Sequence, residues 1–254
     1  MKETDSTVKK QTGIQPAATT EIITFDVLRK LTRLTLGPDD LKYLGVSGLN
    51  CGCYTNMMES ALNTDWIGIG GRTYEMYKTY TVEDAFYLID EKWLYLNHDA
   101  RKNFPLEDGV FRWAVAEHFI EHLEQEEALH WLNEVYRLLA PDAVLRVSTP
   151  DLGKYVRAYE KRDLAFFQGI SESLHQQGVE HCSSPASLFN LCFRGWKHKY
   201  IYDSTDLFAL IRKSAFSDSN IEIVDHQQSS RPYLMNLDTD YRKIESIYVE
   251  ITKK

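Results

Sequence analysis

Short apolar runs alternate with longer amphipathic stretches along most of the chain. Apolar runs bounded by turn residues predict buried strands, and the stretches between them predict helices that cover a parallel sheet. The predicted strands are LKYLGV (41–46), DWIGI (65–69), WLYLNHD (93–99), VFRWAVAEH (110–118), AVLRVSTP (143–150), NIEIVDHQ (220–227) and IESIYVEIT (244–252). We therefore expect an α/β fold with a seven-strand, mostly parallel sheet that ends in an antiparallel C-terminal strand pair.

Helical spacing of apolar residues marks the segments that should cover this sheet. ITFDVLRKLTRLTL (23–36) predicts one helix, stopped by Gly37-Pro38, and QEEALHWLNEVYRLLA (125–140) predicts a second with acidic residues near its N-terminus. Asp151 is a candidate N-cap for a third, LGKYVRAYEKRDLAFFQ (152–168). Residues 1–21 are polar and predict a flexible tail. We expect residues 22–254 to form one domain, with lid insertions near 72–92 and 154–203.

Composition and charge exclude several classes of partner. The 254 residues carry a formal net charge of -8, which argues against nucleic acid or an anionic membrane surface, since both require a basic face. No apolar run approaches the roughly 20 residues of a membrane span, and the N-terminal residues lack the apolar core of a secretory signal. Four cysteines are too few for a disulfide scaffold. We expect a cytoplasmic protein and leave homo-oligomerisation open.

Two features near the start of the predicted sheet are candidates for ligand binding. LGVSGLNCG (44–52) contains three glycines, which let a backbone turn sharply and approach a ligand closely. The spacing is not the G-x-G-x-x-G of dinucleotide-binding folds, and ordinary turns are also rich in glycine. Asp65, at the start of the second predicted strand, can accept both hydroxyls of a ribose, although it could instead be an ordinary strand-entry aspartate or a cap.

Residues 97–152 carry a more specific pattern. The informative segments, in order, are His98-Asp99-Ala100, Phe104-Pro105-Leu106, Glu121-His122-Leu123, Leu132 through Pro141, and Pro150-Asp151-Leu152. Their order and spacing resemble the central part of class I methyltransferases that use S-adenosylmethionine (SAM). HKYIYDSTDLFALIRKSAF (198–216) is similar to a later helix of that family. The resemblance implies a three-layer Rossmann-like sandwich and methyl transfer from SAM.

The resemblance also implies a binding site, residue by residue. Glycines and backbone of the first turn would wrap the amino-acid end of the cofactor, one aspartate would hold the ribose, and a second would accept from the adenine amine. The glutamate that ends the fourth predicted strand would lie beside the methyl group. The cofactor-binding residues expected on this basis are Gly45, Gly48, Leu49, Asn50, Asp65, Asp99, Ala100 and Glu117. No metal is expected, because a sulfonium is already activated for transfer.

Histidines are the candidate catalytic residues, since imidazole can remove a proton from an acceptor hydroxyl near neutral pH. His118, His122 and His198 are the three candidates, and each could instead pack structurally. The interpretation that follows is methyl transfer to a small-molecule or glycan acceptor, with a hydroxyl favoured over an amine.

Two alternatives compete with that interpretation. The chain departs from the family pattern at Lys42-Tyr43, at Arg112 and at Pro141-Asp142-Ala143, which favours a non-catalytic SAM-binding partner or regulatory domain. His118, Glu121 and His122 also match H-x-x-E-H, the zinc-binding motif of some peptidases, which leaves a zinc hydrolase as a weaker alternative.

Overall fold

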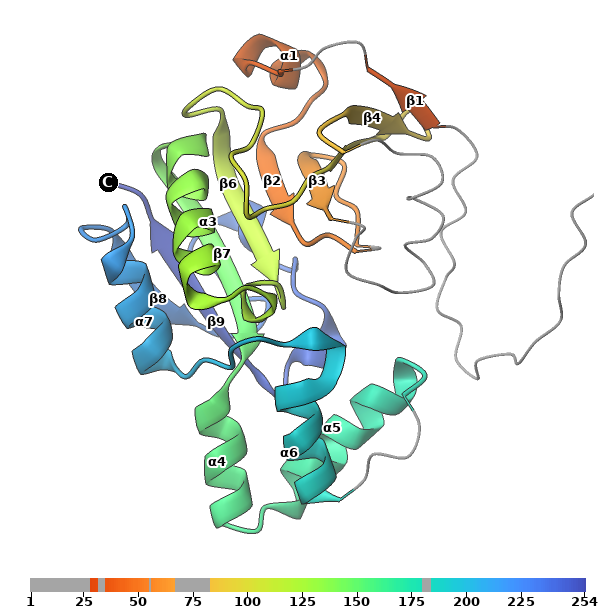
Figure 1. Cartoon of the computed structure of the whole chain (residues 1–254), viewed down its shortest axis with the longest axis vertical. Helices are drawn as coiled ribbons and strands as arrows, with labels where there is room; N and C mark the ends of the chain where they lie inside the picture. Colours follow the sequence, from red (N-terminus) through yellow and green to blue (C-terminus); the bar gives the residue numbers. More distant parts are fainter. Residues whose placement is uncertain (1–27, 32–34, 55, 67–82, 180–183) are drawn as a thin grey trace, which may run out of the picture.

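The computed structural model describes residues 28–31, 35–54, 56–66, 83–179 and 184–254 (Figure 1). The predicted tail at 1–21, residues 67–69 of the second predicted strand, residues 72–82 of the first predicted insertion, and Cys182 lie outside these ranges. In the described part of the chain, no helix is long and apolar enough to cross a membrane.

The described residues form one nine-stranded sheet in the order β1-β4-β5-β3-β2-β6-β7-β9-β8. The strands are β1 (Leu28–Lys30), β2 (Gly48–Cys51), β3 (Ala61–Asp65), β4 (Phe86–Ile89), β5 (Trp93–Asn97), β6 (Phe111–Glu117), β7 (Leu139–Pro150), β8 (Asn220–Val224) and β9 (Ser246–Thr252). Strands β5, β3, β2, β6 and β7 are parallel, and β9 runs antiparallel to both β7 and β8. The predicted Rossmann-like α/β class is confirmed, with nine strands rather than seven because β4 and β1 extend one edge.

The two faces of the sheet are covered differently. Along β6, Phe111, Ala114 and Ala116 point into the main core, whereas Trp113 and Val115 point to the opposite side. We call the first side the helix face, because α3 (Gln125–Leu138) and α7 (Ser204–Lys213) pack there (Figure 1). We call the second the far face. The connection between β8 and β9, residues 225–245, contributes Leu234 to the apolar cluster of the far face.

A buried arginine fastens that connection to the sheet. Arg146 of β7 is 2% exposed and makes a bidentate ion pair with Asp238, at 2.8 and 2.5 Å. Its remaining nitrogen lies 2.7 Å from the Glu250 carboxylate of β9. Backbone carbonyls of Asp225 and Gln228 accept further hydrogen bonds from the same guanidinium. The buried charges are therefore fully paired, which is the condition under which they are tolerated.

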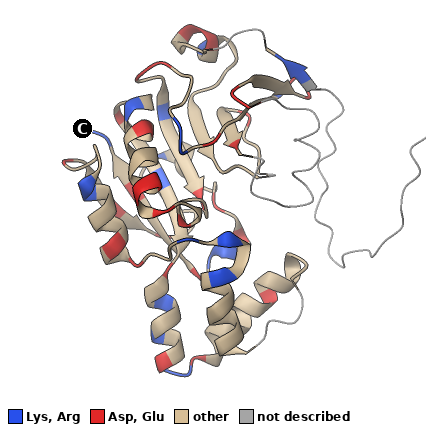
Figure 2. Cartoon of the chain, in the orientation of Figure 1, with Lys and Arg blue, Asp and Glu red and all other residues tan. Residues whose placement is uncertain are grey.

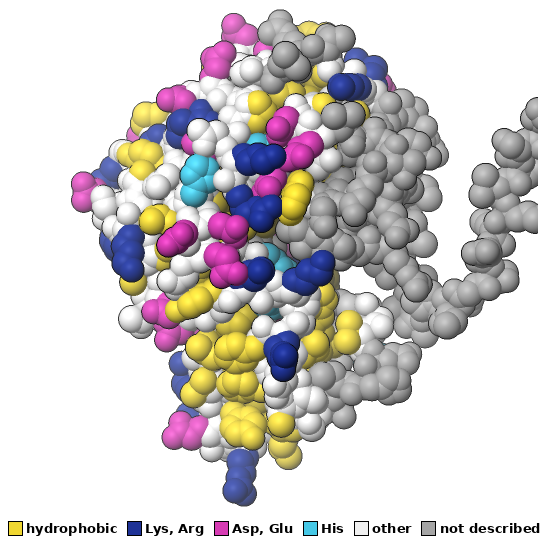
Figure 3. Space-filling view, in the orientation of Figure 1, with side chains coloured by type: hydrophobic (Ala, Val, Ile, Leu, Met, Phe, Trp, Pro, Cys, Tyr) yellow, Lys and Arg dark blue, Asp and Glu magenta, His cyan; other side chains and the backbone are white. Residues whose placement is uncertain are grey.

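A smaller helical unit lies beyond the carboxyl ends of the strands. It comprises α4 (Leu152–Glu160), α5 (Leu164–Gln176) and α6 (Pro185–Arg194), which share a core of their own, and it ends in the 3-10 turn η2 (Gly195–Lys197). Figure 3 shows hydrophobic side chains gathered on its surface. The helix predicted over 152–168 is broken, because Arg162 has a φ of 53° and Asp163 caps a new helix at α5.

At the N-terminal end, two of the predicted elements are wrong where they are described, and a third is shifted. The helix predicted over 23–36 is contradicted where it is described, because β1 pairs with β4. The first half of the strand predicted over 41–46 belongs instead to the helix α1 (Pro38–Tyr43). A proline in the first turn favours the start of this helix, and the Gly37 amide donates to the Asp40 carboxylate there at 3.2 Å. The second predicted strand is displaced, since β3 ends at Asp65. Short apolar runs fit either period, so pairing and capping decide.

Candidate functional site

A cavity of about 240 Å³ lies where the carboxyl ends of β2, β3, β5 and β6 meet. At β2 the strand order turns back, because β3 lies on one side and β6 on the other, and such a reversal opens a crevice that binds ligands in open α/β sheets. The lining residues are Cys51, Gly52, Thr64, Asp65, Trp66, His98, Asp99, Ala100, Arg101, Phe119, His122, Leu123, Glu127, Lys197 and Lys199.

Gly52 makes the turn that opens this cavity. It directly follows β2 and has a φ of 66°, a left-handed conformation that side chains other than glycine rarely adopt. Its amide donates to the Thr64 carbonyl at 2.9 Å. A Cβ atom at Gly52 would lie 2.5 Å from the Phe119 ring. Only glycine therefore lets the backbone pass between β2 and Phe119 along the cavity wall.

Asp65 stands at the carboxyl end of β3, on the rim of the cavity. Its carboxylate accepts a hydrogen bond of 2.8 Å from the Tyr54 amide, which belongs to the turn after β2. This bond ties the two strand ends together and holds the carboxylate at the cavity. The position is the one in which an acidic residue of a Rossmann-like fold meets ribose hydroxyls.

Asp99 follows β5 and is held by a neighbouring arginine. The Arg101 guanidinium donates to both carboxylate oxygens, at 2.8 and 2.7 Å, and lies 4.5 Å from the centre of the Trp66 ring. Burial alone would raise the pKa of Asp99, but the hydrogen bonds from Arg101 hold that pKa below its usual value. An anionic carboxylate is thus fixed beside Ala100 in the cavity wall.

Three residues expected at the cofactor lie elsewhere, because the strand begins later than the sequence suggested. Gly45 lies in the turn after α1, and its amide donates to the Lys42 carbonyl at 3.1 Å. Gly48 is inside β2, where a Cβ atom would collide with the Trp113 ring at 2.1 Å. Leu49 is fully buried in the core of the helix face. None of the three lines the larger cavity.

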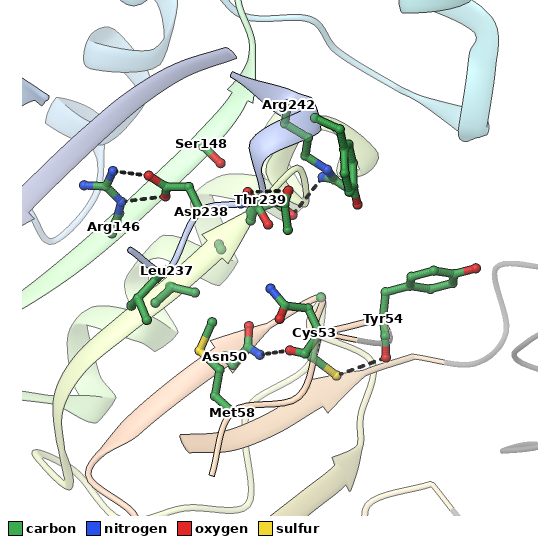
Figure 4. Close-up of a pocket in the computed structure, with 16 residues that line it drawn as sticks. Asn50, Cys53, Tyr54, Met58, Arg146, Ser148, Leu237, Asp238, Thr239 and Arg242 are labelled. Atoms are coloured by element: carbon green, nitrogen blue, oxygen red, sulfur yellow. Dashed lines mark hydrogen bonds and ion pairs between the residues drawn. The ribbon is translucent and has the colours of Figure 1, made fainter. Parts of the chain in front are cut away.

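Asn50 and Glu117 also miss this cavity, because alternation along their strands turns them to the far face. The Asn50 amide donates to the Asn56 carbonyl at 2.7 Å and to Asn63 at 3.0 Å. The Glu117 carboxylate accepts from the backbone and hydroxyl of Thr239, at 2.8 and 3.0 Å. Both residues line a second cavity of about 40 Å³, and the β8–β9 connection forms another part of its wall (Figure 4). Asp65, Asp99 and Ala100 are the cofactor candidates that do line the larger cavity.

The three candidate histidines converge at one end of the site, around Glu121. The His118 Nδ1 atom lies 3.4 Å from the Glu121 carboxylate, and the His122 and His198 rings are 4.9 Å apart in an edge-to-face arrangement. The amides of Lys199 and Tyr200 donate to the Glu121 carbonyl at 2.7 and 3.2 Å. These backbone bonds bring the segment after η2 onto the short turn η1 (Ile120–His122). Of the three, His122 lines the larger cavity.

Burial governs the charge of this cluster. It lowers the pKa of His118 well below its usual value and lowers that of His122 to about 4, with further repulsion from His198 and Arg242. Burial likewise lowers the pKa of His198 and raises that of Glu121 to about 8. The three imidazoles are therefore neutral at pH 7, and each keeps a nitrogen lone pair.

The H-x-x-E-H motif does not form the helical zinc site of peptidases. That motif requires both histidines on one face of an α-helix. Here His118 follows the end of β6 with a φ of 48°, and His122 belongs to a 3-10 turn. The arrangement on which the zinc-hydrolase alternative depended is therefore absent at these residues.

Several cavity residues had little or no signal in the sequence. Gly52 lay within the glycine-rich motif, but the strand was placed too early for it to be chosen. Arg101 and Trp66 come together only through tertiary structure, as do Phe119 and Gly52. Cys51 lines the cavity as a protonated thiol, because burial raises its pKa to about 12.

No family model matches the chain, and no curated protein matches it significantly. Solved structures of similar shape include a SAM-dependent methyltransferase from Archaeoglobus fulgidus, with a TM-score of 0.44, 14% identity, and coverage of 84% of this chain and 89% of that one. Another comes from Thermotoga maritima, with a TM-score of 0.43, 16% identity, and coverage of 82% of each chain. A small RNA methyltransferase has a TM-score of 0.43 and 14% identity, and the match covers 84% of this chain and 24% of that one. Because these sequence identities are low, the chemistry of the site has to be inferred from the residues of this chain alone.

Proposed function

We propose that this protein is a SAM-dependent methyltransferase that acts on a hydroxyl of a small molecule or glycan. The observation that carries the proposal is the cavity at the reversal of the strand order, where the Gly52 turn, Asp65 and Asp99 meet. These are the groups that the sequence resemblance assigns to the backbone, ribose and adenine contacts of SAM, with Gly52 in place of Gly45 and Gly48.

The described residues fit such a cofactor on chemical grounds. Asp65 offers carboxylate oxygens at the end of the second parallel strand, which suit a pair of ribose hydroxyls. Ala100, Leu123 and Trp66 offer apolar or aromatic surface for a purine. Gly52 offers a close backbone approach at the cavity wall, between β2 and the Phe119 ring. When bound, SAM supplies a methyl group that needs no further activation.

The acceptor is proposed to lie at the end of the cavity formed by His122. An acceptor hydroxyl must lose its proton, and His118, His122 and His198 are neutral groups able to take it. Lys197 and Lys199 line the same end and can orient polar substituents by hydrogen bonds. The residues of the cluster thus position the acceptor and receive a proton.

The charge distribution supports a small acceptor over nucleic acid. The whole chain carries a net charge of -8, and Figure 2 shows acidic and basic residues interspersed on the described helices and strands. A polyanion would require a continuous basic surface.

Of the residues at the site, Asp99 fits the cofactor least well, in a methyltransferase and in a non-catalytic SAM-binding domain alike. Arg101 already satisfies both oxygens of the Asp99 carboxylate, so adenine would have to share that carboxylate or displace the guanidinium. Assays of SAM binding and of methyl transfer distinguish the methyltransferase from the non-catalytic domain. A non-catalytic domain binds SAM without methylating hydroxyl-bearing acceptors.

Calorimetric titration with SAM and with its demethylated product tests the proposal. We expect both to bind, and Asp65→Ala to weaken their affinity about 10- to 100-fold, the loss expected for hydrogen bonds to a charged group. Asp218→Ala is a matched control, because Asp218 is exposed and does not line the cavity, and it should leave the affinity unchanged. Failure of both ligands to bind the wild-type protein at millimolar concentration would overturn the proposal.

A further inference from the structure

Glu121, His122 and His198 form a group of ligating side chains that the proposed function leaves partly unused. One ligand atom from each of the three residues lies within 4.8 Å of the others. Glu121 is fully buried, and the two histidines are half-buried beside it. The histidines come from η1 and from the segment after η2, so the group is assembled by tertiary structure rather than by one helix.

Two atoms of this group are buried and unsatisfied. Within the described residues, Glu121 Oε1 and His122 Nδ1 make no hydrogen bond, and His118 Nδ1 lies 3.4 Å from Glu121 Oε1, whereas Glu121 Oε2 accepts from the Thr149 hydroxyl at 3.0 Å. A buried polar atom without a partner is destabilising, and nearly all buried polar atoms in native proteins are paired. The unpaired atoms belong to two of the three residues in the group and point to a missing ligand.

His198 is oriented in the way that metal-binding histidines usually are. Its Nδ1 atom lies 2.6 Å from the Cys192 carbonyl, an acceptor only, so Nδ1 carries the proton. The Nε2 atom is then unprotonated and free to bind an ion. A backbone carbonyl that fixes the tautomer of a ligating histidine is a recurrent feature of metal sites.

The backbone around the group is held in sparsely populated conformations. His118 has a φ of 48°, and Trp196 and Lys197, which directly precede His198, have values of 49° and 65°. Residues other than glycine seldom adopt such conformations, which are enriched at functional sites, although surface turns of this chain such as that at Arg162 also contain them. The strain lies on both segments that deliver the ligands.

We propose that Glu121, His122 and His198 bind one divalent transition-metal ion, of the Zn²⁺ class, at the wall of the larger cavity. Two imidazoles and one carboxylate form the ligand set of many catalytic zinc sites, and imidazole disfavours Mg²⁺. Tetrahedral ligation at about 2.1 Å needs ligand atoms about 3.4 Å apart, so the side chains move inward by roughly 1 Å on binding. This assignment departs from the sequence-based expectation that no metal is used.

The charges near the group allow a divalent ion. Arg242 lies close enough to lower the pKa of all three histidines and opposes a cation. Glu117 and Glu245 oppose that effect, and the Arg242 guanidinium itself donates to the Glu117 carbonyl at 3.3 Å. Glu121, whose pKa burial raises to about 8, loses its proton when an ion binds. An ion bound to the Glu121 carboxylate also supplies the partner that its buried oxygen lacks.

The role of the ion rests on the proposed function. Three protein ligands leave at least one position of a tetrahedral ion open, and His122 places that position at the cavity. With His122 and His198 bound to the ion, an acceptor hydroxyl at the open position would have a lowered pKa, and its proton would leave to solvent or to His118, which is not a ligand, without any oxidation or reduction. The substrate class is then an acceptor whose hydroxyl oxygen can bind a metal, such as a vicinal diol.

Titration of the full-length protein, stripped with EDTA, tests the site directly. Zn²⁺ binding is followed by calorimetry and Co²⁺ binding by its visible absorption, which reports tetrahedral ligation. We expect one ion per chain, no Mg²⁺ binding at concentrations where Zn²⁺ saturates, and a loss of affinity of about 100-fold or more in His122→Ala and in His198→Ala. The exposed His175→Ala on α5 is the matched control and should bind as the wild type does. No Zn²⁺ binding, or equal affinity in His122→Ala, would overturn the site.

Two further measurements keep the interpretation clear. Glu121→Gln retains the hydrogen bond with Thr149 and the packed volume, so the variant should fold. Its affinity for the ion should be at least tenfold weaker than that of the wild type. An unchanged affinity would contradict ligation by Glu121. SAM affinity should be the same with and without EDTA. If SAM fails to bind while Zn²⁺ binds, the proposed function fails and the metal site stands. If transfer persists unchanged in EDTA, the role of the ion in the reaction is wrong.

Discussion

The two faces of the sheet differ in how the buried polar side chains near the strand ends are paired. On the far face, Arg146, Asp238 and Glu250 satisfy one another, and the cavity beside them measures about 40 Å³. On the helix face, a cavity of about 240 Å³ remains, and the group beside it contains buried atoms without partners. The paired charges of the far face fasten a connection. Buried atoms without a hydrogen bond occur on both faces, Ser148 Oγ and Tyr248 OH on the far face among them, so the helix face differs in that two such atoms belong to a group of ligating side chains beside the larger cavity.

The strongest way to break this comparison is to remove the arginine of the far face. Arg146→Met leaves Asp238 and Glu250 buried without a counter-charge, and we expect the free energy of unfolding to fall by about 3–5 kcal/mol. Urea denaturation followed by circular dichroism measures this. Adding Asp238→Asn and Glu250→Gln to the same variant should recover part of the loss, because the stranded charges are removed. A loss below about 1 kcal/mol in Arg146→Met would show that the network is not structural.

An intermediate effect is expected at the turn of the larger cavity. Gly52→Ala must adopt a φ of 66° and also displace the Phe119 ring, so we expect unfolding free energy to fall by about 2 kcal/mol and SAM affinity to fall at least tenfold. Gly109→Ala is the matched control, since its φ is also 66° but a Cβ atom meets nothing within 4 Å. It should cost about 1 kcal/mol and leave SAM affinity unchanged. Equal SAM affinities in the two variants would argue against the Gly52 turn as a cofactor contact.

The smallest effect is expected for Glu117, which the sequence resemblance placed beside the methyl group. Its carboxylate faces away from the larger cavity and contacts Thr239. Glu117→Gln should therefore change SAM affinity by less than about twofold and lower the unfolding free energy by about 1 kcal/mol, the contribution of a modest hydrogen bond. Calorimetry and urea denaturation measure the two quantities. A tenfold loss of SAM affinity would restore the original prediction.

Sequence patterns were most reliable in the middle of the chain. Strands β5, β6 and β7 and helix α3 lie close to their predicted positions, because their apolar runs are long and are bounded by clear turn residues. The N-terminal part was harder, since 41–46 is a short apolar run without a decisive period and the helical spacing over 23–36 did not determine its structure where it is described. There, pairing of β1 with β4 and the start of α1 at Pro38 decided the structure. Because β2 begins at Gly48 rather than near residue 41, the glycine that turns at the carboxyl end of the strand is Gly52, not Gly45 or Gly48.

By itself, the sequence determined the α/β class, the mostly parallel character of the sheet, and Asp65 and Asp99 as the acidic candidates beside two of its strands. These follow from local periodicity and from residues that lie near one another in the chain. Tertiary structure alone decided which face each side chain occupies, because a strand alternates sides with every residue and its register is set by pairing. It also brought His198 to Glu121, since two backbone bonds from the Lys199 segment join parts of the chain that no local pattern relates.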